Sequence, residues 1–320
     1  MKKFLSLVLL GTVALPGVSL AQAIIDNGTI QLGVDSLGQL NIGGGTLSGQ
    51  GTTTIVGLRD MATNYESTAD GCVCEGWGAG VGDTLTSGRA NNAYGISNVS
   101  LVSFANTAST ATSVSDVGSS LRITHTFTPA VETPNLYRVS VSIENISGAA
   151  IADLRYSRVM DWDIEPTAFS EFVTIGGTAA ATSVLYADDN GFTNGDPFAV
   201  PGSILASGDF IDSGAADHGA RFNFGFGALG VGKTFNFDIF YGAADSEALA
   251  YSALSAVSAE AYSFGQANDN MDGSHGPTFI FGFAGVGGVV IAPVPIPASG
   301  LLLLGGLGLL GSLRARRRKA

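Results

Sequence analysis

Positive charge is scarce in the long region between the two ends of the chain. Seven of the 15 Lys and Arg residues lie within the first three or the last seven positions, and the other eight stand against 27 Asp and Glu residues, which leaves this region with a net charge of −19. Such a surface repels nucleic acid and anionic membranes, so we expect neither as a partner. It attracts cations, which favours Ca²⁺ or basic partners, although solubility alone also explains the charge.

Cysteine and histidine are scarce as well. The two cysteines are Cys72 and Cys74, and the three histidines, His125, His218 and His275, are far apart in the sequence. A disulfide between residues two apart requires a turn, which the flanking glycines can provide; free or mixed thiols and a metal site are the alternatives. The G-x-S-x-G pattern of a nucleophilic serine is also missing. We therefore predict no catalytic residue, and whether the protein is an enzyme stays open.

Glycine is abundant, at 45 of 320 residues, and lacks the period of collagen. Apolar and polar residues alternate in many segments, as in 136–143, where Val139, Val141 and Ile143 should face one way. Such segments predict an all-β fold over residues 24–290, an antiparallel β-sandwich or super-sandwich. Residues 245–262 instead have apolar residues at helical spacing, which predicts one amphipathic helix packed on the sheet.

Both ends of the chain carry apolar segments. Lys2 and Lys3 precede the apolar residues 4–15, and small residues follow at 19–21 and 21–23, which is typical of a cleavable signal peptide over 1–23. The other end begins with a proline-containing motif, continues with the apolar residues 300–313 and closes with a basic stretch. The motif is Val294, Pro295, Ile296, Pro297 and Ala298, and the basic stretch contains Arg314, Arg316, Arg317, Arg318 and Lys319.

The prolines hold the motif extended, and the cations keep the apolar segment from sliding through a membrane. At 14 residues this segment is short for a membrane helix, which needs about 17–25. A buried core helix is the alternative, but the segment has no polar face. We predict a C-terminal transmembrane helix.

This order of motif (294–299), apolar segment (300–313) and basic end (314–320) resembles the sorting tail of the PEP-CTERM class of exported bacterial proteins. It is similar to the variant named for Val-Pro-Leu-Pro-Ala, with Ile296 in place of Leu. The resemblance covers residues 291–320. It implies processing by signal peptidase and an exosortase-type enzyme, an inner-membrane-anchored precursor, and a final place at the cell surface or outside the cell. It also implies a link to exopolysaccharide or biofilm. Residues 24–290 resemble only uncharacterised exported proteins of this class.

The densest group of carboxylates lies between residues 155 and 166. On a strand Asp161, Asp163 and Glu165 share one face. Their charges need neutralising, either by Arg155 and Arg158 in an ion-pair network or by Ca²⁺. A carboxylate pair for glycoside hydrolysis is a third interpretation.

A second acidic segment, residues 188–196, contains Asp188, Asn190 and Asp196. It is either a plain turn or a second Ca²⁺ site. It departs from the EF-hand pattern because Ala199 stands where that loop needs a bidentate carboxylate.

Residues 227–234 match the phosphate-loop pattern G-x-x-x-x-G-K-[ST]. A strand rather than a helix should follow, so we predict a glycine-rich hairpin turn and no nucleotide binding.

The sequence favours a surface or matrix protein. A carbohydrate-binding β-sandwich is the first alternative and would need an exposed aromatic platform, for which Trp77, Trp162 and Tyr156 are candidates. A glycan-active enzyme is the second.

Overall fold

The computed structural model of the protein describes residues 22–268 and 276–293. Within these residues the fold is all-β, every strand pairing is antiparallel, and the strands form three sheets. The largest sheet contains β8 (Val99–Asn106), β9 (Ala111–Val117), β10 (Leu121–Pro129), β11 (Leu136–Asn145), β13 (Glu171–Gly176), β15 (Phe210–Ala216), β17 (Thr234–Ala244), β18 (Ala261–Gln266) and β19 (Thr278–Ala284). Its spatial order is β15-β13-β18-β19-β17-β11-β10-β9-β8.

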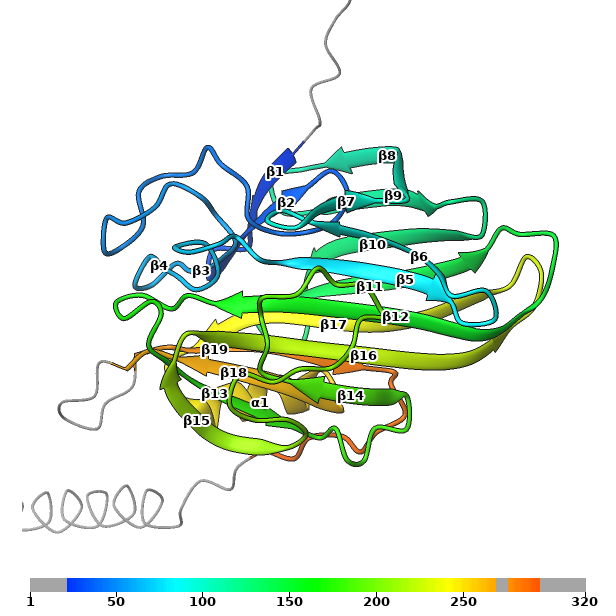
Figure 1. Cartoon of the computed structure of the whole chain (residues 1–320). Coiled ribbons are helices and arrows are strands. Elements are labelled where there is room, and N and C mark those ends of the chain that lie inside the picture. Colours follow the sequence, from blue (N-terminus) through cyan, green and yellow to red (C-terminus); the bar gives the residue numbers. More distant parts are fainter. Residues whose placement is uncertain (1–21, 269–275, 294–320) are drawn as a thin grey trace, which may run out of the picture.

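The second sheet contains β5 (Gly76–Val81), β6 (Thr86–Asn91), β7 (Gly95–Ser97), β12 (Ile151–Trp162), β14 (Val184–Asp188) and β16 (His218–Leu229). Its order is β14-β16-β12-β5-β6-β7. A small sheet of β1 (Gln22–Asp26), β2 (Ile30–Asp35), β3 (Leu58–Asp60) and β4 (Tyr65–Glu66) lies at one end. Figure 1 shows the β5–β12–β16 sheet lying over the larger one, which gives the protein a β-sandwich-like architecture.

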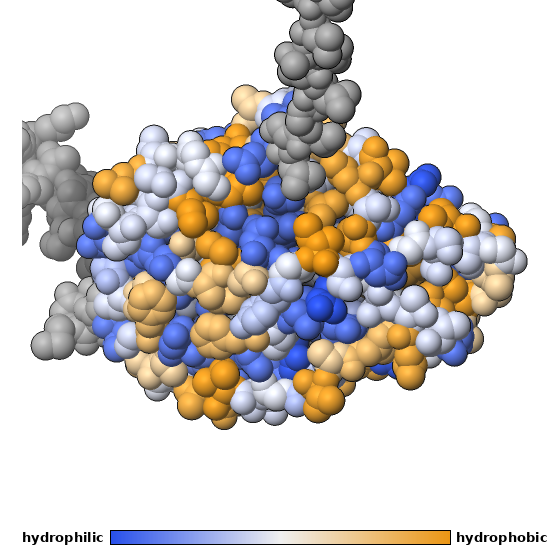
Figure 2. Space-filling model, turned by 45° about the horizontal axis from the view of Figure 1, so that its top comes forward, coloured by the Kyte–Doolittle hydropathy of each residue, from blue (hydrophilic) through white to orange (hydrophobic). Residues whose placement is uncertain are grey.

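The main core fills the space between the two large sheets. Val139, Val141 and Ile143 on β11 are buried there, while Ser140 between them is exposed, which confirms the predicted alternation. Tyr156 on β12 and Phe222 on β16 belong to the same buried cluster. Burial of side chains of this size supplies about 1.5–3 kcal/mol each. On the face shown in Figure 2, hydrophobic side chains form small groups separated by hydrophilic ones.

The predicted helix is present but shorter than expected. Helix α1 (Glu247–Ala256) starts after Ser246, whose side chain accepts a hydrogen bond from the Leu249 N–H and so caps the N-terminus. Leu254 packs with Phe240 and Ile280 on the outer face of the larger sheet. The predicted end at residue 262 is wrong, because Ala261–Gln266 forms β18, paired with β13 and β19.

The phosphate-loop match is a strand–turn–strand segment. Gly227 and Leu229 end β16, a turn closed by the Lys233 N–H to the Gly230 carbonyl follows, and Thr234 begins β17. The prediction of a turn without a following helix is confirmed. The two strands belong to different sheets, however, so the segment is a connection between sheets and not a hairpin.

Residues 1–21 of the predicted signal peptide (1–23) lie outside the described residues, and its last two residues are the start of β1. The predicted sorting motif, transmembrane helix and basic end at 294–320 also lie outside the described residues. Among the residues that are described, no helix is long and apolar enough to cross a membrane.

Candidate functional site

Four carboxylates lie close together where the chain passes between the two large sheets. Asp161 is near the end of β12, and Asp163 follows in the segment that leads to β13. Glu171 is the first residue of β13, and Asp217 is the single residue between β15 and β16. The chain thus crosses between the sheets twice, from β12 to β13 and from β15 to β16, and both crossings lie at the left end of the sheets in Figure 1. We call these four residues the acidic cluster.

The antiparallel register brings the two crossings together. Asp161 is paired with Gly219 and Trp162 with His218, so Asp217 lies beside the end of β12. One carboxylate oxygen from each of Asp161, Asp163 and Asp217 lies within 4.8 Å of the others. Two Ca²⁺–oxygen bonds of about 2.4 Å span the same separation, so a single Ca²⁺ ion would fit between these oxygens.

Three of the four carboxylates are buried and each has an oxygen without a hydrogen-bond partner. Asp161 is 2% exposed, and Asp163 and Glu171 are 0% exposed. The partnerless atoms are Asp161 Oδ1, Asp163 Oδ1 and Glu171 Oε2. The second oxygen of Asp163 accepts from the Gly71 N–H at 3.1 Å, and that of Glu171 from the Ile164 N–H at 3.0 Å. Because buried polar groups normally have partners, these oxygens are suited to bind a cation or a proton.

Burial shifts the protonation of the cluster strongly. It raises the pKa of Asp161 to about 9, with the carboxylates of Asp163, Asp217 and Glu171 adding to the shift. Burial followed by the Asp217 charge raises the pKa of Asp163 to about 7, and burial raises that of Glu171 to about 9. Burial also raises the pKa of Asp217. Without a cation, the cluster therefore holds protons near neutral pH.

Glycine backbones line two of the carboxylates. A Cβ placed on Gly191 would lie 2.6 Å from Asp161 Oδ1, and one on Gly71 would lie 2.6 Å from Asp163 Oδ2. Real Cβ atoms do not approach so closely, so any larger residue would push the carboxylates away. The loops at 71 and 191 thus approach the cluster as closely as the backbone allows.

Glu165 does not join Asp161 and Asp163, so this part of the predicted Ca²⁺ site is wrong. Because β12 ends at Trp162, the alternation of a strand no longer applies at Glu165. Its side chain accepts hydrogen bonds from the hydroxyls of Ser48 and Thr52, each at 2.5 Å, and from the Glu66 N–H at 3.0 Å.

The predicted ion-pair network is also wrong. Arg155 pairs with Asp153, and Arg158 forms a fully buried pair with Glu75 at 2.6 Å. Glu75 also accepts from the Leu40 N–H at 2.6 Å and the Tyr241 hydroxyl at 3.1 Å. Among the described residues, no Lys or Arg forms a salt bridge with the acidic cluster.

The residues of the second predicted Ca²⁺ site each have partners within the chain. Asp188 forms a buried ion pair with Arg221. Asn190 donates to the Gly202 carbonyl at 2.6 Å, and Asp196 accepts from the Ser87 hydroxyl at 2.9 Å. This segment therefore offers a cation less free oxygen than the acidic cluster does.

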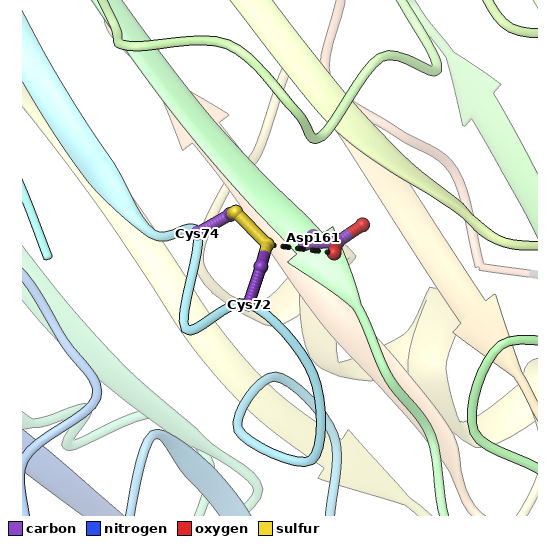
Figure 3. Close-up of side chains that lie close together, drawn as sticks. All are labelled: Cys72, Cys74 and Asp161. Carbon is purple, nitrogen blue, oxygen red and sulfur yellow. Dashed lines mark hydrogen bonds between the residues drawn. A yellow bond between two sulfur atoms is a disulfide. The ribbon is translucent and has the colours of Figure 1, made fainter. Parts of the chain in front are cut away.

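Cys72 and Cys74 are joined by a disulfide with a Cα–Cα distance of 5.1 Å. The next residue, Glu75, anchors the cysteine loop in the core through Arg158. Figure 3 shows the disulfide lying against the end of β12, with the Cys72 sulfur facing Asp161. The Cys72 Sγ to Asp161 Oδ2 distance is 3.2 Å.

The predicted aromatic platform is wrong, because Trp77, Trp162 and Tyr156 are fully buried in the core. The exposed aromatic side chains among the described residues are Tyr94, at 44%, and Phe169, at 50%.

Both exposed rings border the acidic cluster. A Cβ on Gly71 would lie 2.9 Å from Phe169 Cε1 as well as close to Asp163. Tyr94 is in the turn after β6, where the Asn92 N–H donates to the Glu75 carbonyl beside the cysteine loop. Burial and then the Asp161 charge raise the pKa of Tyr94.

Two of the three histidines, His125 and His218, have partners within the fold, and His275 lies outside the described residues. The buried His125 contacts the Tyr156 hydroxyl at 3.0 Å, and burial keeps its pKa well below the ordinary value. His218 lies between the Asp189 carboxylate and the Glu171 carbonyl, at 3.0 and 3.2 Å. It holds the start of β13 beside the cluster.

Sequence reasoning missed Glu171 and Asp217. Neither belongs to a local motif, and strand pairing between distant segments brings them to Asp161. The sequence holds a weak signal for each: Glu171 directly precedes the expected strand 172–175, and Asp217 stands beside His218. Comparison with protein-family models and with curated proteins finds no match to this chain.

Proposed function

We propose that the protein is an exported cell-surface or matrix protein whose acidic cluster binds Ca²⁺ and so ties its two large sheets together. The observation that carries the proposal is the set of three buried carboxylate oxygens without partners at Asp161, Asp163 and Glu171. Oxygen is the ligand that Ca²⁺ prefers, and the cluster contains no nitrogen ligand. Asp217, which is exposed, gives an ion access from solvent.

The geometry favours a cation over hydrolysis. The oxygens of Asp161, Asp163 and Asp217 lie within 4.8 Å of one another. A glycosidase needs its two carboxyl groups on either side of the glycosidic bond that it cleaves. Two of these three side chains are also buried, which leaves little room for a sugar ring between them. A glycan-active enzyme is therefore the weakest of the three functions considered.

The location rests on the sequence of the two ends. The signal-like N-terminus and the motif at 294–298 support export by way of signal peptidase and an exosortase-type enzyme, from an inner-membrane-anchored precursor. The transmembrane helix at 300–313 belongs to this proposal. Signal cleavage after Ala21 would leave β1 whole, because that strand starts at Gln22.

Calorimetry with Ca²⁺ tests the cation site directly. The purified region from residue 22 to residue 293 should bind Ca²⁺, and the D161N/D163N variant should lose at least about tenfold in affinity, or about 1.4 kcal/mol. D116N is the matched control, because Asp116 pairs with Arg122 on the surface away from the cluster. The site would be rejected if the wild-type region does not bind millimolar Ca²⁺, or if D161N/D163N and D116N bind it equally well.

Carbohydrate binding is a second candidate function, and the position of Tyr94 and Phe169 favours it. Exposed rings stack on the apolar faces of sugars, and a neighbouring Ca²⁺ ion can accept sugar hydroxyls as ligands. The partner would be an extracellular polysaccharide. Retention of the Y94A/F169A variant on immobilised polysaccharides should fall relative to wild type, while Ca²⁺ affinity stays unchanged. V131A, which removes an exposed apolar side chain elsewhere, is the control.

A further inference from the structure

The disulfide and the acidic cluster share one carboxylate. Cys72, Cys74 and Asp161 each offer a ligand atom within 4.8 Å of the other two, and Asp161 also belongs to the group with Asp163 and Asp217. Figure 3 shows the disulfide beside the end of β12, with a dashed line from the Cys72 sulfur to the Asp161 carboxylate. Asp161 is therefore placed to complete either of two ligand sets.

The oxidised cysteines do not satisfy Asp161. A disulfide sulfur carries no hydrogen to donate, so the 3.2 Å contact with Asp161 Oδ2 is not a hydrogen bond in this state. Since Asp161 Oδ1 has no partner either, the whole carboxylate lacks a donor. The disulfide also closes a loop of minimal length, which makes its effect on chain entropy small. Stabilising the fold is thus a weak reason for placing these cysteines beside a buried carboxylate.

Reduction changes the chemistry of this position. The two thiols can lose their protons to a bound metal, and thiolates are the ligands that zinc and other soft cations prefer. Two sulfurs and one carboxylate oxygen provide three ligands and leave one position open, as in zinc sites that bind a water or another molecule. The backbone beside Cys74 is held by the Arg158–Glu75 pair, so the second thiolate would stay near its present position.

We propose that Cys72, Cys74 and Asp161 form a zinc site when the disulfide is reduced. A dithiol reductant supplies two electrons and two protons: its sulfurs become a disulfide, and the Cys72–Cys74 bond opens to two thiols. Zn²⁺ then displaces the two thiol protons and takes Asp161 as its third protein ligand. The half-buried Cys72 is the sulfur that a reductant can reach, whereas Cys74 is buried. This site does not require that the acidic cluster binds Ca²⁺.

Metal titration of the oxidised and reduced protein tests this site. A phosphine should be the reductant, because dithiols themselves bind zinc; it takes up an oxygen from water as the disulfide becomes two thiols. Thiol counting on the folded protein confirms the reduction. We expect one equivalent of Zn²⁺ to bind after reduction and at least tenfold weaker binding before it. Co²⁺ in place of Zn²⁺ should give the near-ultraviolet thiolate-to-metal absorption.

Variants separate the roles of the ligands. C72S/C74S should lose the absorption, and D161N, which keeps both thiols, should weaken Zn²⁺ binding at least tenfold. D116N is the control and should bind Zn²⁺ like wild type, because Asp116 pairs with Arg122 at the surface and belongs to neither ligand group. Zinc affinity that does not depend on reduction, or a disulfide that resists reduction in the folded protein, would overturn the proposal. Equal affinity of D161N and wild type would remove Asp161 from the site.

Discussion

In the absence of divalent cations, the acidic cluster should make the protein less stable as the pH rises above about 5. Burial raises the pKa of Asp161 and of Glu171 to about 9 and that of Asp163 to about 7. The same carboxyls in the unfolded chain titrate near their ordinary values of about 4. The folded state therefore keeps protons that the unfolded chain has released. This stabilisation is fully present below about pH 4 and is lost as the pH rises through about 7–9.

The slope follows from the number of retained protons. Each proton held by the folded state alone lowers the free energy of unfolding by about 1.4 kcal/mol per pH unit. Because the carboxyls share their protons, we count about one to two between about pH 5 and pH 7, which gives a loss of roughly 3–6 kcal/mol over this range. Whole domains have free energies of unfolding of about 5–15 kcal/mol, so this loss is readily measured.

Urea unfolding in a chelator at several pH values measures this slope. Millimolar Ca²⁺ should restore stability most at high pH, by about 2.7 kcal/mol when its concentration is 100 times the Kd. The D161N/E171Q variant should flatten the slope, and D116N should not. Ordinary surface carboxylates are ionised by about pH 5 and contribute little above it. Stability in chelator that is constant or rises from about pH 5 to pH 8 would refute the reasoning.

Three further outcomes are expected. G191A should weaken Ca²⁺ binding at least about tenfold in calorimetry because its Cβ would displace Asp161, whereas G43A, with open space at that position, should bind normally. E75A should lower the free energy of unfolding in urea by about 3–5 kcal/mol because Arg158 stays buried without its partner, and a loss below about 1 kcal/mol would contradict this. Neutralising the basic end should weaken membrane retention in cell fractionation. Replacing both prolines of the sorting motif with alanine should leave an anchored, unprocessed precursor. If the intact mass of the wild-type mature protein still includes Ala320, sorting is excluded.

The strands could be predicted from the sequence because their signal is local. Alternation in β11 follows directly from one face being buried and the other wet. The end of the helix could not be predicted, because Ala and Ser tolerate both structures and pairing with β13 and β19 decides where α1 gives way to β18. Which aromatic rings are exposed depends likewise on sheet packing, and Trp77 and Trp162 are among the most buried residues.

The candidate site was predicted in part, for the same reason. Asp161 and Asp163 are neighbours in the sequence and remain together in space. Grouping Glu165 with them assumes that the strand continues, but β12 ends before it. Glu171 and Asp217 reach the cluster only through the register of β12 with β16 and the start of β13.

Four carboxylates at two sheet crossings are an unfavourable arrangement unless a cation binds there. Burial of Asp161, Asp163 and Glu171 costs free energy whether they ionise or hold protons, and an apolar crossing would avoid that cost. A Ca²⁺ site makes the arrangement favourable where Ca²⁺ is abundant, as it is outside cells, where modules bind it with Kd values of about 10⁻⁴–10⁻³ M. Before export, in a compartment with little free Ca²⁺, the same carboxylates would oppose closure of the two sheets. The proposed cation site and the proposed export thus support each other: the chain would gain its full stability only after it leaves the cell, which suits a protein that must stay unfolded until translocation is complete.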